Sequence, residues 1–245
     1  MKYVSVMQPT FLPWIGYFAL IDYVDAFVFL DDVQLEKRSW QMRNYIKGGN
    51  GPVLLSVNIR TKPSRPLIFE TQIADSKFET KLMRTIETLL HPAPYSEQAI
   101  EILREGFDKC GSNLSLLNVT IIKRIMSLVG ISTPTYLASE LKLDKFEKAV
   151  RHLKFTEYFG GSCYLSAIGS AEYIKENNPF INSDVKLRFF NYIHPTYDQS
   201  GSKFLSHMSA IEAIAYVGLN DFLSLARGGI KKPLTITEVF EGPNE

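Results

Sequence analysis

The densest group of chemically special residues lies in the segment 8–18, where two prolines, Trp14, Gly16 and Tyr17 stand close together. A short apolar run, 3–7, precedes this segment, and a second apolar run with helical spacing follows it. Strand-to-helix junctions of this kind commonly hold ligands in α/β proteins. The free N–H groups at the start of the helix would suit a phosphate or a carboxylate. The alternative is a tight turn whose aromatic side chains cap a core.

A pair of acids, Asp31 and Asp32, follows the apolar run 26–30. The carboxyl ends of parallel strands face the ligand crevice, so either acid could act as a general base or bind a hydroxyl or an amine. Adjacent carboxylates could also hold Mg²⁺. Successive side chains on a strand point in opposite directions, however, so we expect only one of the two to face a ligand and predict no metal site.

Basic and aromatic residues gather in the polar segment that follows, at Arg38, Trp40, Arg43 and Asn44. Arginine can bind phosphate or carboxylate through two parallel hydrogen bonds, and tryptophan can stack on a base or a sugar. A solvated basic face is the alternative interpretation.

The chain has four histidines, and His194 is the one that follows an apolar strand-like run. A histidine there could serve as a base near neutral pH, although a structural histidine is the competing interpretation. We expect His91 and His152 at the surface. The segment 163–166 contains Cys163 and Ser166 and could supply a nucleophile.

The elements that must position these residues follow from the hydrophobic pattern. A strand over 2–7, a helix from Pro13 and a buried strand over 26–30 predict a βαβ unit with a parallel sheet. Further strands are expected over 53–59, 131–137, 163–166 and 185–192, and helices over 76–90, 96–109, 114–129, 145–159, 168–177 and 209–217. The fold class is therefore α/β, with a Rossmann-like parallel-sheet core and a helical lobe. We expect one domain over 1–235, with a helical subdomain at 76–130 and a frayed tail at 236–245.

Composition narrows the class of protein. The net charge of +1 gives no overall electrostatic sign of nucleic-acid binding. The two cysteines match neither a disulfide framework nor a metal-ligand spacing. No signal peptide and no transmembrane run is evident, so we expect a soluble cytoplasmic protein that does not contact a membrane.

Motifs along nearly the whole chain resemble the WbqC-like protein family. They comprise Gln8-Pro9, Pro13-Trp14, Gly16-Tyr17-Phe18, Asp25-Ala26-Phe27-Val28, Asp31-Asp32-Val33-Gln34, Trp40, Arg43-Asn44, Ile46, Ser139-Glu140-Leu141, Tyr164-Leu165-Ser166, Tyr173, Tyr197-Asp198-Gln199 and Ser209-Ala210-Ile211-Glu212. The chain departs from the family pattern at Ser206-His207, where a proline is expected, and at Glu212, where an aspartate is expected. The first loop also resembles a degenerate His-x-Gly-His loop of nucleotidyltransferases, with Trp14 and Tyr17 in the imidazole positions.

The family resemblance implies a role in bacterial surface-polysaccharide (O-antigen) biosynthesis. It implies transfer of an aminoacyl group, typically glycyl, or another acyl group to the amine of a nucleotide-linked amino sugar. The donor is left open between an aminoacyl-tRNA, an acyl-CoA and a free amino acid with ATP, and no resident cofactor is assigned. A non-catalytic nucleotide- or sugar-binding protein and an ATP-dependent adenylating enzyme are the alternatives. The oligomeric state is left open.

Joining the two lines of reasoning assigns roles to single residues. Asp31 or His194 would be the base. The expected substrate-binding residues are Gln8, Pro9, Trp14, Gly16, Tyr17, Asp32, Gln34, Arg38, Trp40, Arg43, Asn44, Tyr164, Ser166, Tyr197 and Gln199. Among them, Arg38 and Arg43 would hold phosphates, and Gln8, Asn44 and Gln199 would orient the acceptor.

Overall fold

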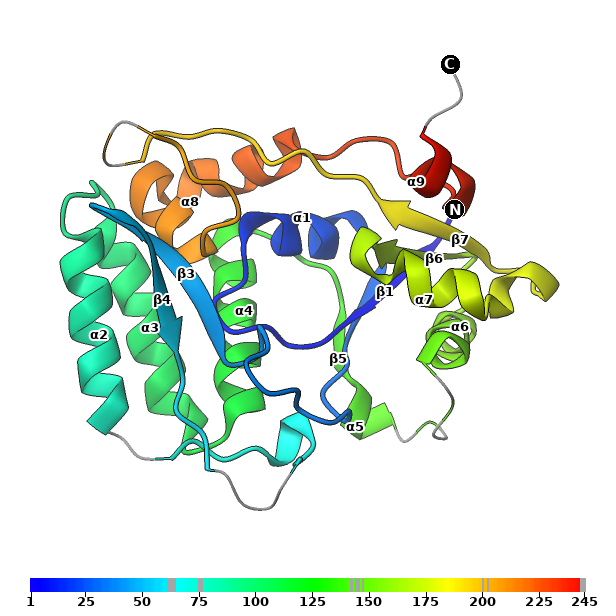
Figure 1. The fold of residues 1–245 in the computed structure, drawn as a ribbon, viewed down its shortest axis with the longest axis horizontal. Helices are drawn as coiled ribbons and strands as arrows, with labels where there is room; N and C mark the ends of the chain where they lie inside the picture. Colours follow the sequence, from blue (N-terminus) through cyan, green and yellow to red (C-terminus); the bar gives the residue numbers. More distant parts are fainter. Residues whose placement is uncertain are drawn as a thin grey trace.

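A computed structural model describes residues 1–60, 65–74, 77–141, 143, 146, 148–199, 201 and 203–242. Its centre is a five-stranded sheet in the order β5-β2-β1-β6-β7, in which every neighbouring pair is parallel. The strands are β1 (Tyr3–Met7), β2 (Ala26–Phe29), β5 (Thr135–Leu137), β6 (Cys163–Ala167) and β7 (Lys186–Phe190). The predicted α/β fold with a parallel-sheet core is confirmed (Figure 1).

Both faces of this sheet are buried, which explains why its central strands are mostly apolar. Alternate side chains of β2 enter different cores, since Phe27 and Phe29 pack with α1 (Ile15–Tyr23) while Val28 packs on the opposite side. The second core is closed by α6 (Lys148–Tyr158) and α7 (Ala171–Glu176).

The strand order changes direction beside β1. The chain runs from β1 to β2 and β5 on one side, and then returns to place β6 and β7 on the other. In open parallel sheets, ligands bind outside the carboxyl ends of the strands where the order reverses. This rule points to the carboxyl ends of β1 and β6, together with the adjacent end of β2.

The predicted helical lobe consists of α2 (Lys77–Leu90), α3 (Ser96–Cys110) and α4 (Leu114–Val129). The expected first residue of the lobe, Ser76, lies outside the described residues. Gly106 lets α3 approach α4 closely, because a Cβ atom there would lie 2.4 Å from Ile121. One hydrophobic cluster continues from the lobe through α8 (Ala210–Gly228) to α1. The division into a domain and a subdomain stays a prediction.

Three predictions of secondary structure were wrong. A hairpin of β3 (Arg43–Gly48) and β4 (Gly51–Ser56) begins inside the polar segment after Asp32, where no strand was predicted before residue 53. Its polar residues hid it, because Asn44 and Lys47 are buried in β3 where the pattern favours apolar side chains.

The other two differences lie near the C-terminus. Helix α8 does not stop at Gly218 but changes direction there at a φ of 76° and continues to Gly228, because Phe222 and Ala226 are buried beyond the kink. The expected frayed tail begins with α9 (Ile236–Glu241), whose first turn is capped reciprocally by Thr235 and Glu238. Across the described residues, none of the helices combines the length and the apolar character needed to cross a membrane.

Candidate functional site

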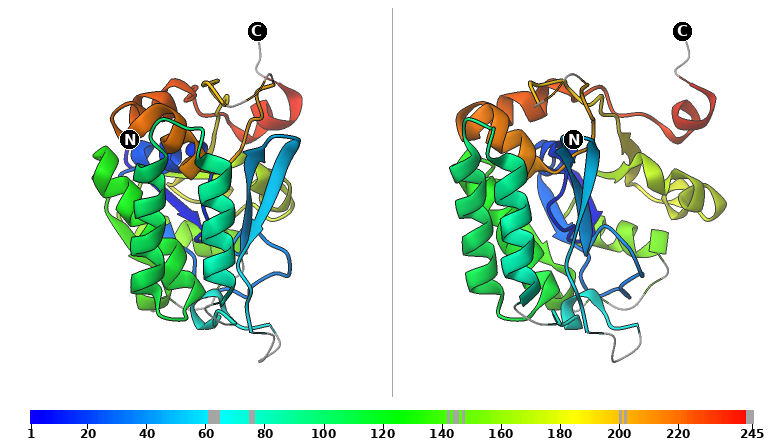
Figure 2. Two further views of the ribbon diagram at one scale, coloured as in Figure 1. Left: turned by 90° about the vertical axis from the view of Figure 1, so that its left-hand side faces the viewer. Right: turned by 60° about the vertical axis from the view of Figure 1, so that its left-hand side comes forward.

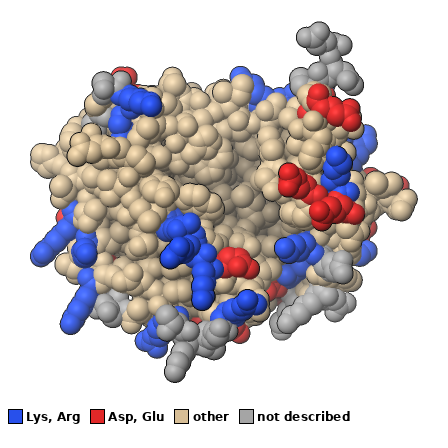
Figure 3. Space-filling view, viewed as in Figure 1, with Lys and Arg blue, Asp and Glu red and all other residues tan. Residues whose placement is uncertain are grey.

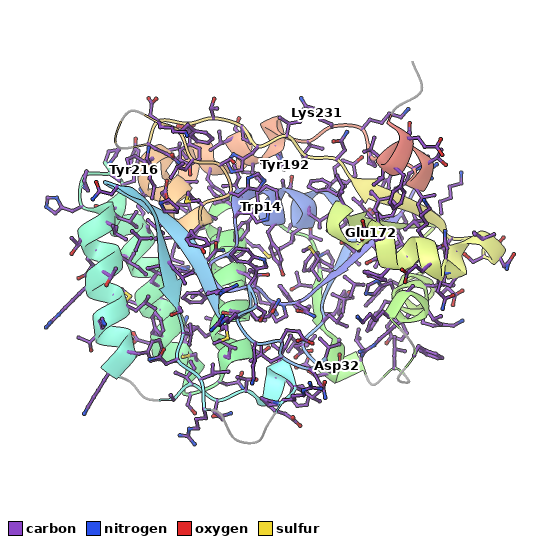
Figure 4. All side chains as sticks on the ribbon, viewed as in Figure 1. Trp14, Asp32, Glu172, Tyr192, Tyr216 and Lys231 are labelled. Atoms are coloured by element: carbon purple, nitrogen blue, oxygen red, sulfur yellow. The ribbon has the colours of Figure 1, made fainter. Side chains whose placement is uncertain are left out.

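The candidate site is the crevice at the carboxyl ends of β1, β2 and β6. The surface is hollowed in the middle of this face, and uncharged side chains make up most of the hollow (Figure 3). Trp14 and Tyr192 lie above the middle of the same view, Glu172 lies to the right and Asp32 lies below (Figure 4). The crevice is therefore bordered by segments that are distant in the sequence.

The loop after β1 is held by two buried asparagines. Asn44 donates from Nδ2 to the carbonyls of Phe11 at 3.2 Å and Leu12 at 2.6 Å. Asn118 of α4 donates to the carbonyl of Pro9 at 3.0 Å. Leu12 has a φ of 45°, which is strained for a residue with a side chain, so the asparagine bonds fix a conformation that the loop would otherwise avoid. The loop is thus preorganised.

These contacts correct two predicted roles and add one residue. Asn44 is buried with its amide engaged by the loop, so it positions the loop and does not face a substrate. Pro9 is buried as well. Asn118 was missed, and its signal was an amide on the apolar stripe of a helix that is otherwise rich in Leu, Ile and Val.

Tyr17 is likewise a core residue. It is buried against Phe18 and Phe27, and its hydroxyl donates to the carbonyl of Gln8 at 3.1 Å. Burial raises the pKa of the Tyr17 hydroxyl far above its ordinary value. The structure therefore places Tyr17 in the core, and its contact with a substrate stays a prediction. Gln8 itself is partly exposed at the crevice.

Trp14 folds back over the first turn of α1. A Cβ atom at Gly16 would lie 2.2 Å from the Trp14 ring, so only glycine permits this placement. Tyr192, His194 and His207, from the described parts of the segment 191–209, pack against the ring. The His194 ring stacks on the Trp14 ring, with 5.8 Å between the ring centroids and 18° between the ring planes. The centroid of the His207 ring lies 4.7 Å from that of Trp14. Two imidazoles therefore reach the N-terminus of α1 from a remote segment.

His194 is set up as a neutral base. Its Nδ1 lies 2.7 Å from the carbonyl oxygen of Pro195, and because a carbonyl can only accept, Nδ1 carries the proton. Nε2 is then the basic nitrogen, and it is buried with no hydrogen-bond partner among the described residues. The pKa of His194 lies below its ordinary value, mainly because the ring is buried. The hydrogen bond to Pro195 opposes this shift, and the nearby His207 adds to it. A free basic nitrogen beside an aromatic wall is what a general base requires.

Asp31, the other predicted base, has a different environment. It is 1% exposed, and its two oxygens accept from the backbone N–H of Ser139 at 2.9 Å and from the Ser139 hydroxyl at 2.7 Å. The pKa of Asp31 lies above its ordinary value because the side chain is buried. The two hydrogen bonds from Ser139 oppose part of this shift. Asp31 joins β2 to the start of α5 (Ala138–Leu141), so its geometry supports a positioning role.

Asp32 has a different partner from Asp31, and both acids lie in the irregular segment after β2. It forms an ion pair with Arg151 of α6, and the two side chains are 19% and 8% exposed. Asp32 Oδ1 and Arg151 Nε are both buried without a partner among the described residues. The pair therefore keeps unused polar atoms at the carboxyl end of β2.

The prediction that His152 lies at the surface was wrong. It is buried on α6, where burial and the neighbouring Arg151 lower its pKa to about 4. The hydroxyls of Tyr164 and Tyr173 lie 3.0 and 3.3 Å from His152 Nδ1. Tyr164 and Ser166, both predicted to bind substrate, are buried inside this network and meet the second core instead.

The basic and aromatic cluster is partly assembled. Trp40 is 51% exposed, and the Arg43 guanidinium lies 5.8 Å from its ring. The carbonyl of Trp40 accepts from the backbone N–H of Phe11 at 2.9 Å, which places this pair beside the first loop. Arg38 and Gln34 are exposed.

A buried carboxyl fastens the segment 191–209. Glu212 of α8 accepts from the backbone N–H of Lys47 at 2.7 Å and from the Tyr197 hydroxyl at 3.5 Å. Burial raises the pKa of Glu212 to about 7. Gln199 donates to the Tyr197 hydroxyl at 3.1 Å and bonds both backbone groups of Leu205. Tyr197 and Gln199, predicted to bind substrate, therefore hold this segment beside Trp14. Glu212 was missed as a site residue, although it is the one acid in an apolar helical turn.

No group of three His, Cys, Asp or Glu side chains among the described residues has a metal-binding arrangement.

Comparison with known proteins places this site in a family. The profile of the WbqC-like protein family matches residues 8–222. The chain is also similar to a protein of Mycobacterium tuberculosis (strain ATCC 25618 / H37Rv) named "Uncharacterized protein Rv1507c", with 28% identity over 237 residues that cover 93% of this chain and 100% of the relative. No solved structure matches.

Proposed function

Because the chain belongs to the WbqC-like protein family, we propose that it is a transferase of bacterial surface-polysaccharide (O-antigen) biosynthesis. It transfers an aminoacyl (glycyl) or acyl group to the amine of a nucleotide-linked amino sugar, in the cytoplasm. The observation that carries the proposal is His194, whose basic Nε2 has no partner among the described residues and is buried against Trp14 beside the crevice.

The proposed chemistry needs only one proton carrier. His194 Nε2 takes a proton from the sugar ammonium, and the freed amine attacks the carbonyl carbon of an ester or thioester donor. A C–N bond forms and the C–O or C–S bond of the donor breaks. The nitrogen loses two protons on the way from ammonium to amide: His194 releases the first to solvent, then takes the second after the attack and passes it to the leaving oxygen or sulfur. The lowered pKa of His194 keeps the imidazole neutral and able to accept a proton, and it also makes the imidazole a weaker base.

The remaining groups suit the acceptor. The Asp32–Arg151 pair places a partly exposed carboxylate beside a guanidinium at the carboxyl end of β2, where the carboxylate can accept from a sugar hydroxyl. Arg43 with Trp40 offers a cation and an exposed ring to the phosphate and base of a nucleotide. Gln8 borders the same crevice from the first loop.

A non-catalytic binding protein of the same pathway is the second candidate. It is favoured by the engagement of several polar residues in bonds inside the protein, namely Asp31, Asn44, Tyr164, Tyr197 and Gln199. Fewer groups are then left for chemistry than the sequence indicates.

The test is a transfer assay read by mass spectrometry. Purified protein is incubated with a panel of nucleotide-linked amino sugars and with aminoacyl-tRNA, acyl-CoA, or an amino acid with ATP. A mass gain on the sugar supports the transferase. A shift in Tm without product supports the binding protein. Pyrophosphate release with the ATP arm indicates an adenylating enzyme.

His194→Ala tests the base. We expect kcat to fall by roughly 10²–10⁴-fold with an unchanged Tm, since a positioned base contributes about that much. His91→Ala, which removes an exposed imidazole far from the crevice, is the matched control and should leave kcat unchanged. Equal turnover by the His194→Ala protein would remove His194 from the role.

A further inference from the structure

His207 is a second imidazole beside the crevice, and the proposed transfer does not use it. It lies in the segment 191–209, which runs from β7 past α1 to the start of α8 (Figure 1, Figure 2). Just beyond it, the backbone N–H of Ala210 donates to the carbonyl of Pro13 at 2.8 Å. His207 itself has a φ of 62°, which is uncommon for a residue with a side chain. The fold therefore holds the His207 ring against Trp14 in a strained conformation, which is a frequent mark of functional residues.

The two imidazoles are held by different kinds of partner. His194 Nδ1 donates to the carbonyl of Pro195, which can only accept, so the tautomer is fixed and Nε2 is the basic nitrogen. His207 Nδ1 lies 2.9 Å from the hydroxyl oxygen of Ser206, which can either donate or accept. His207 can therefore carry its proton on either nitrogen, because the Ser206 hydroxyl can rotate to suit. A residue that takes up a proton at one nitrogen and gives one up at the other needs this freedom.

The proposed transfer contains a step that calls for such a residue. The acceptor nitrogen loses two protons, so His194 must discharge the first proton before it can take the second. His194 Nε2 is buried and has no hydrogen-bond partner among the described residues. Direct release of the proton to water is therefore hindered, and the proton leaves most readily through a side chain that contacts the His194 ring.

One of the neighbours of His194 is able to accept this proton. Among the described residues, the side chains in ring contact with His194 are Trp14, Tyr197, Phe204 and His207. Phe204 has no exchangeable proton, and the indole of Trp14 can only donate. Burial raises the pKa of Tyr197 far above its ordinary value, so its hydroxyl stays protonated near neutral pH. His207 is exposed, and its ring centroid lies 5.0 Å from that of His194, which permits transfer directly or through one water.

We infer that His207 is a proton relay, which carries the first proton of the transfer from His194 to water. The proton on His194 Nε2 passes to a ring nitrogen of His207, and His207 then releases one proton to water, so both imidazoles end neutral. No bond to carbon changes in this step. His194 alone satisfies the proton balance, so the relay raises the rate without being indispensable. The inference rests on the proposed transfer at His194.

The His207→Asn protein in the transfer assay tests the relay. Asparagine tolerates a positive φ and keeps a polar side chain, but it cannot carry a proton. We expect kcat to fall at least about tenfold in dilute buffer, with KM unchanged, because the discharge of His194 becomes the slow step. Added imidazole should restore most of the lost rate and should leave the wild type unaffected. Across a series of methylimidazoles the restored rate should depend on the pKa of the added base, which repair of a merely structural defect would not produce.

The matched control is His91→Asn, which removes an exposed imidazole far from the crevice. It should turn over like the wild type and show no response to imidazole, and circular dichroism confirms that each variant is folded. An unchanged kcat in His207→Asn, or a slow variant that imidazole does not accelerate, would overturn the relay and leave the transferase standing. Absence of transfer by the wild type would overturn the proposed function and the relay together.

Long-range proton–nitrogen NMR spectra of the imidazoles test the structural basis of the relay without the reaction. We expect the neutral His194 ring to be protonated at Nδ1, since Pro195 fixes that tautomer, and the neutral His207 ring to exchange between both tautomers. A His194 ring protonated at Nε2, or a His207 ring held wholly in one tautomer, would overturn the relay whatever the transfer assay shows.

Discussion

At the scale of single residues, the buried polar groups explain most of the arrangement around the crevice. Asn44, Asn118 and Glu212 each bond backbone groups of a loop or strand that is remote in the sequence. Leaving a buried donor or acceptor without its partner costs about 1–3 kcal/mol, so each of these contacts strongly favours one loop conformation. The base candidate His194 depends on them, because Glu212 and Asn44 fix the two segments that meet at Trp14.

Glu212 predicts a pH-dependent stability. Its pKa is about 7 in the folded protein against an ordinary value of 4.5, so the folded state keeps a proton that the unfolded state loses. The stability that the protonated Glu212 carboxyl contributes is fully present below about pH 4.5. It falls as the pH rises towards 7, by up to roughly 3 kcal/mol. The difference between the Tm of the Glu212→Gln protein and the Tm of the wild type should therefore increase from pH 5 to pH 8.

Exposed Glu140→Gln is the control, and its Tm difference from the wild type should not change over the same pH range. A flat Tm difference for Glu212→Gln would show that the Glu212 carboxyl is ionised in the folded protein throughout.

Asn44→Ala predicts a loss of stability. The change leaves the carbonyls of Phe11 and Leu12 without their buried donor and releases the strained Leu12. We expect the free energy of unfolding to fall by about 1–3 kcal/mol in urea titrations. Asn220→Ala, on the exposed side of α8, should change it by less than about 0.5 kcal/mol. Similar values for the two variants would contradict the role of Asn44.

At the scale of elements, the kink of α8 decides where its two halves pack. Gly218 has φ and ψ of 76° and 163°, a conformation that residues with a side chain essentially never adopt. The ring of Tyr95 lies only 3.2 Å from the position of an added Cβ atom. The first half of α8 thus reaches the hairpin through Glu212, and the second half covers α1 through Phe222.

Gly218→Ala should accordingly destabilise the protein by about 1–3 kcal/mol, since it combines backbone strain with a close approach to Tyr95. Gly228→Ala is the matched control near the end of the same helix, where no atom lies within 4 Å of the added Cβ. It should be neutral within about 0.5 kcal/mol by urea unfolding. Equal effects of the two substitutions would mean that the kink is not required.

At the scale of the whole molecule, the helical lobe and the sheet share one hydrophobic cluster, which runs from α2, α3 and α4 through α8 and α1 to β2. A shared core couples the unfolding of its parts. The crevice is built on this coupling, because α4 holds the first loop through Asn118 while the sheet holds its beginning at Met7.

We therefore expect one cooperative unfolding transition. The chain has two tryptophans, and in a Trp40→Phe protein the fluorescence reports on Trp14, between α1 and the segment 191–209. Its urea transition should coincide with the transition of the helices by far-ultraviolet circular dichroism. Two separated transitions would show that the region 76–130 folds as an independent subdomain.

The sequence by itself determined the α/β class, the helices of the lobe, the two acids beyond the end of β2, and the family. These features depend on short-range periodicity or on motifs, which a single chain displays directly. The buried, polar strand β3 was hidden because long-range bonds, such as that between Asn44 and the first loop, override its local pattern.

Only the tertiary structure decided which polar residues are free. Asn44, Tyr164, Tyr197 and Gln199 have the residue types of a binding site, yet each is satisfied by a partner brought from elsewhere in the chain. His194 Nε2 has no partner among the described residues, and the His194 ring stacks on Trp14, which lies 180 positions away in the sequence. Residue type is local, whereas the supply of hydrogen-bond partners is set by the packing of segments far apart, and that supply separates the residues of the site from those that hold it.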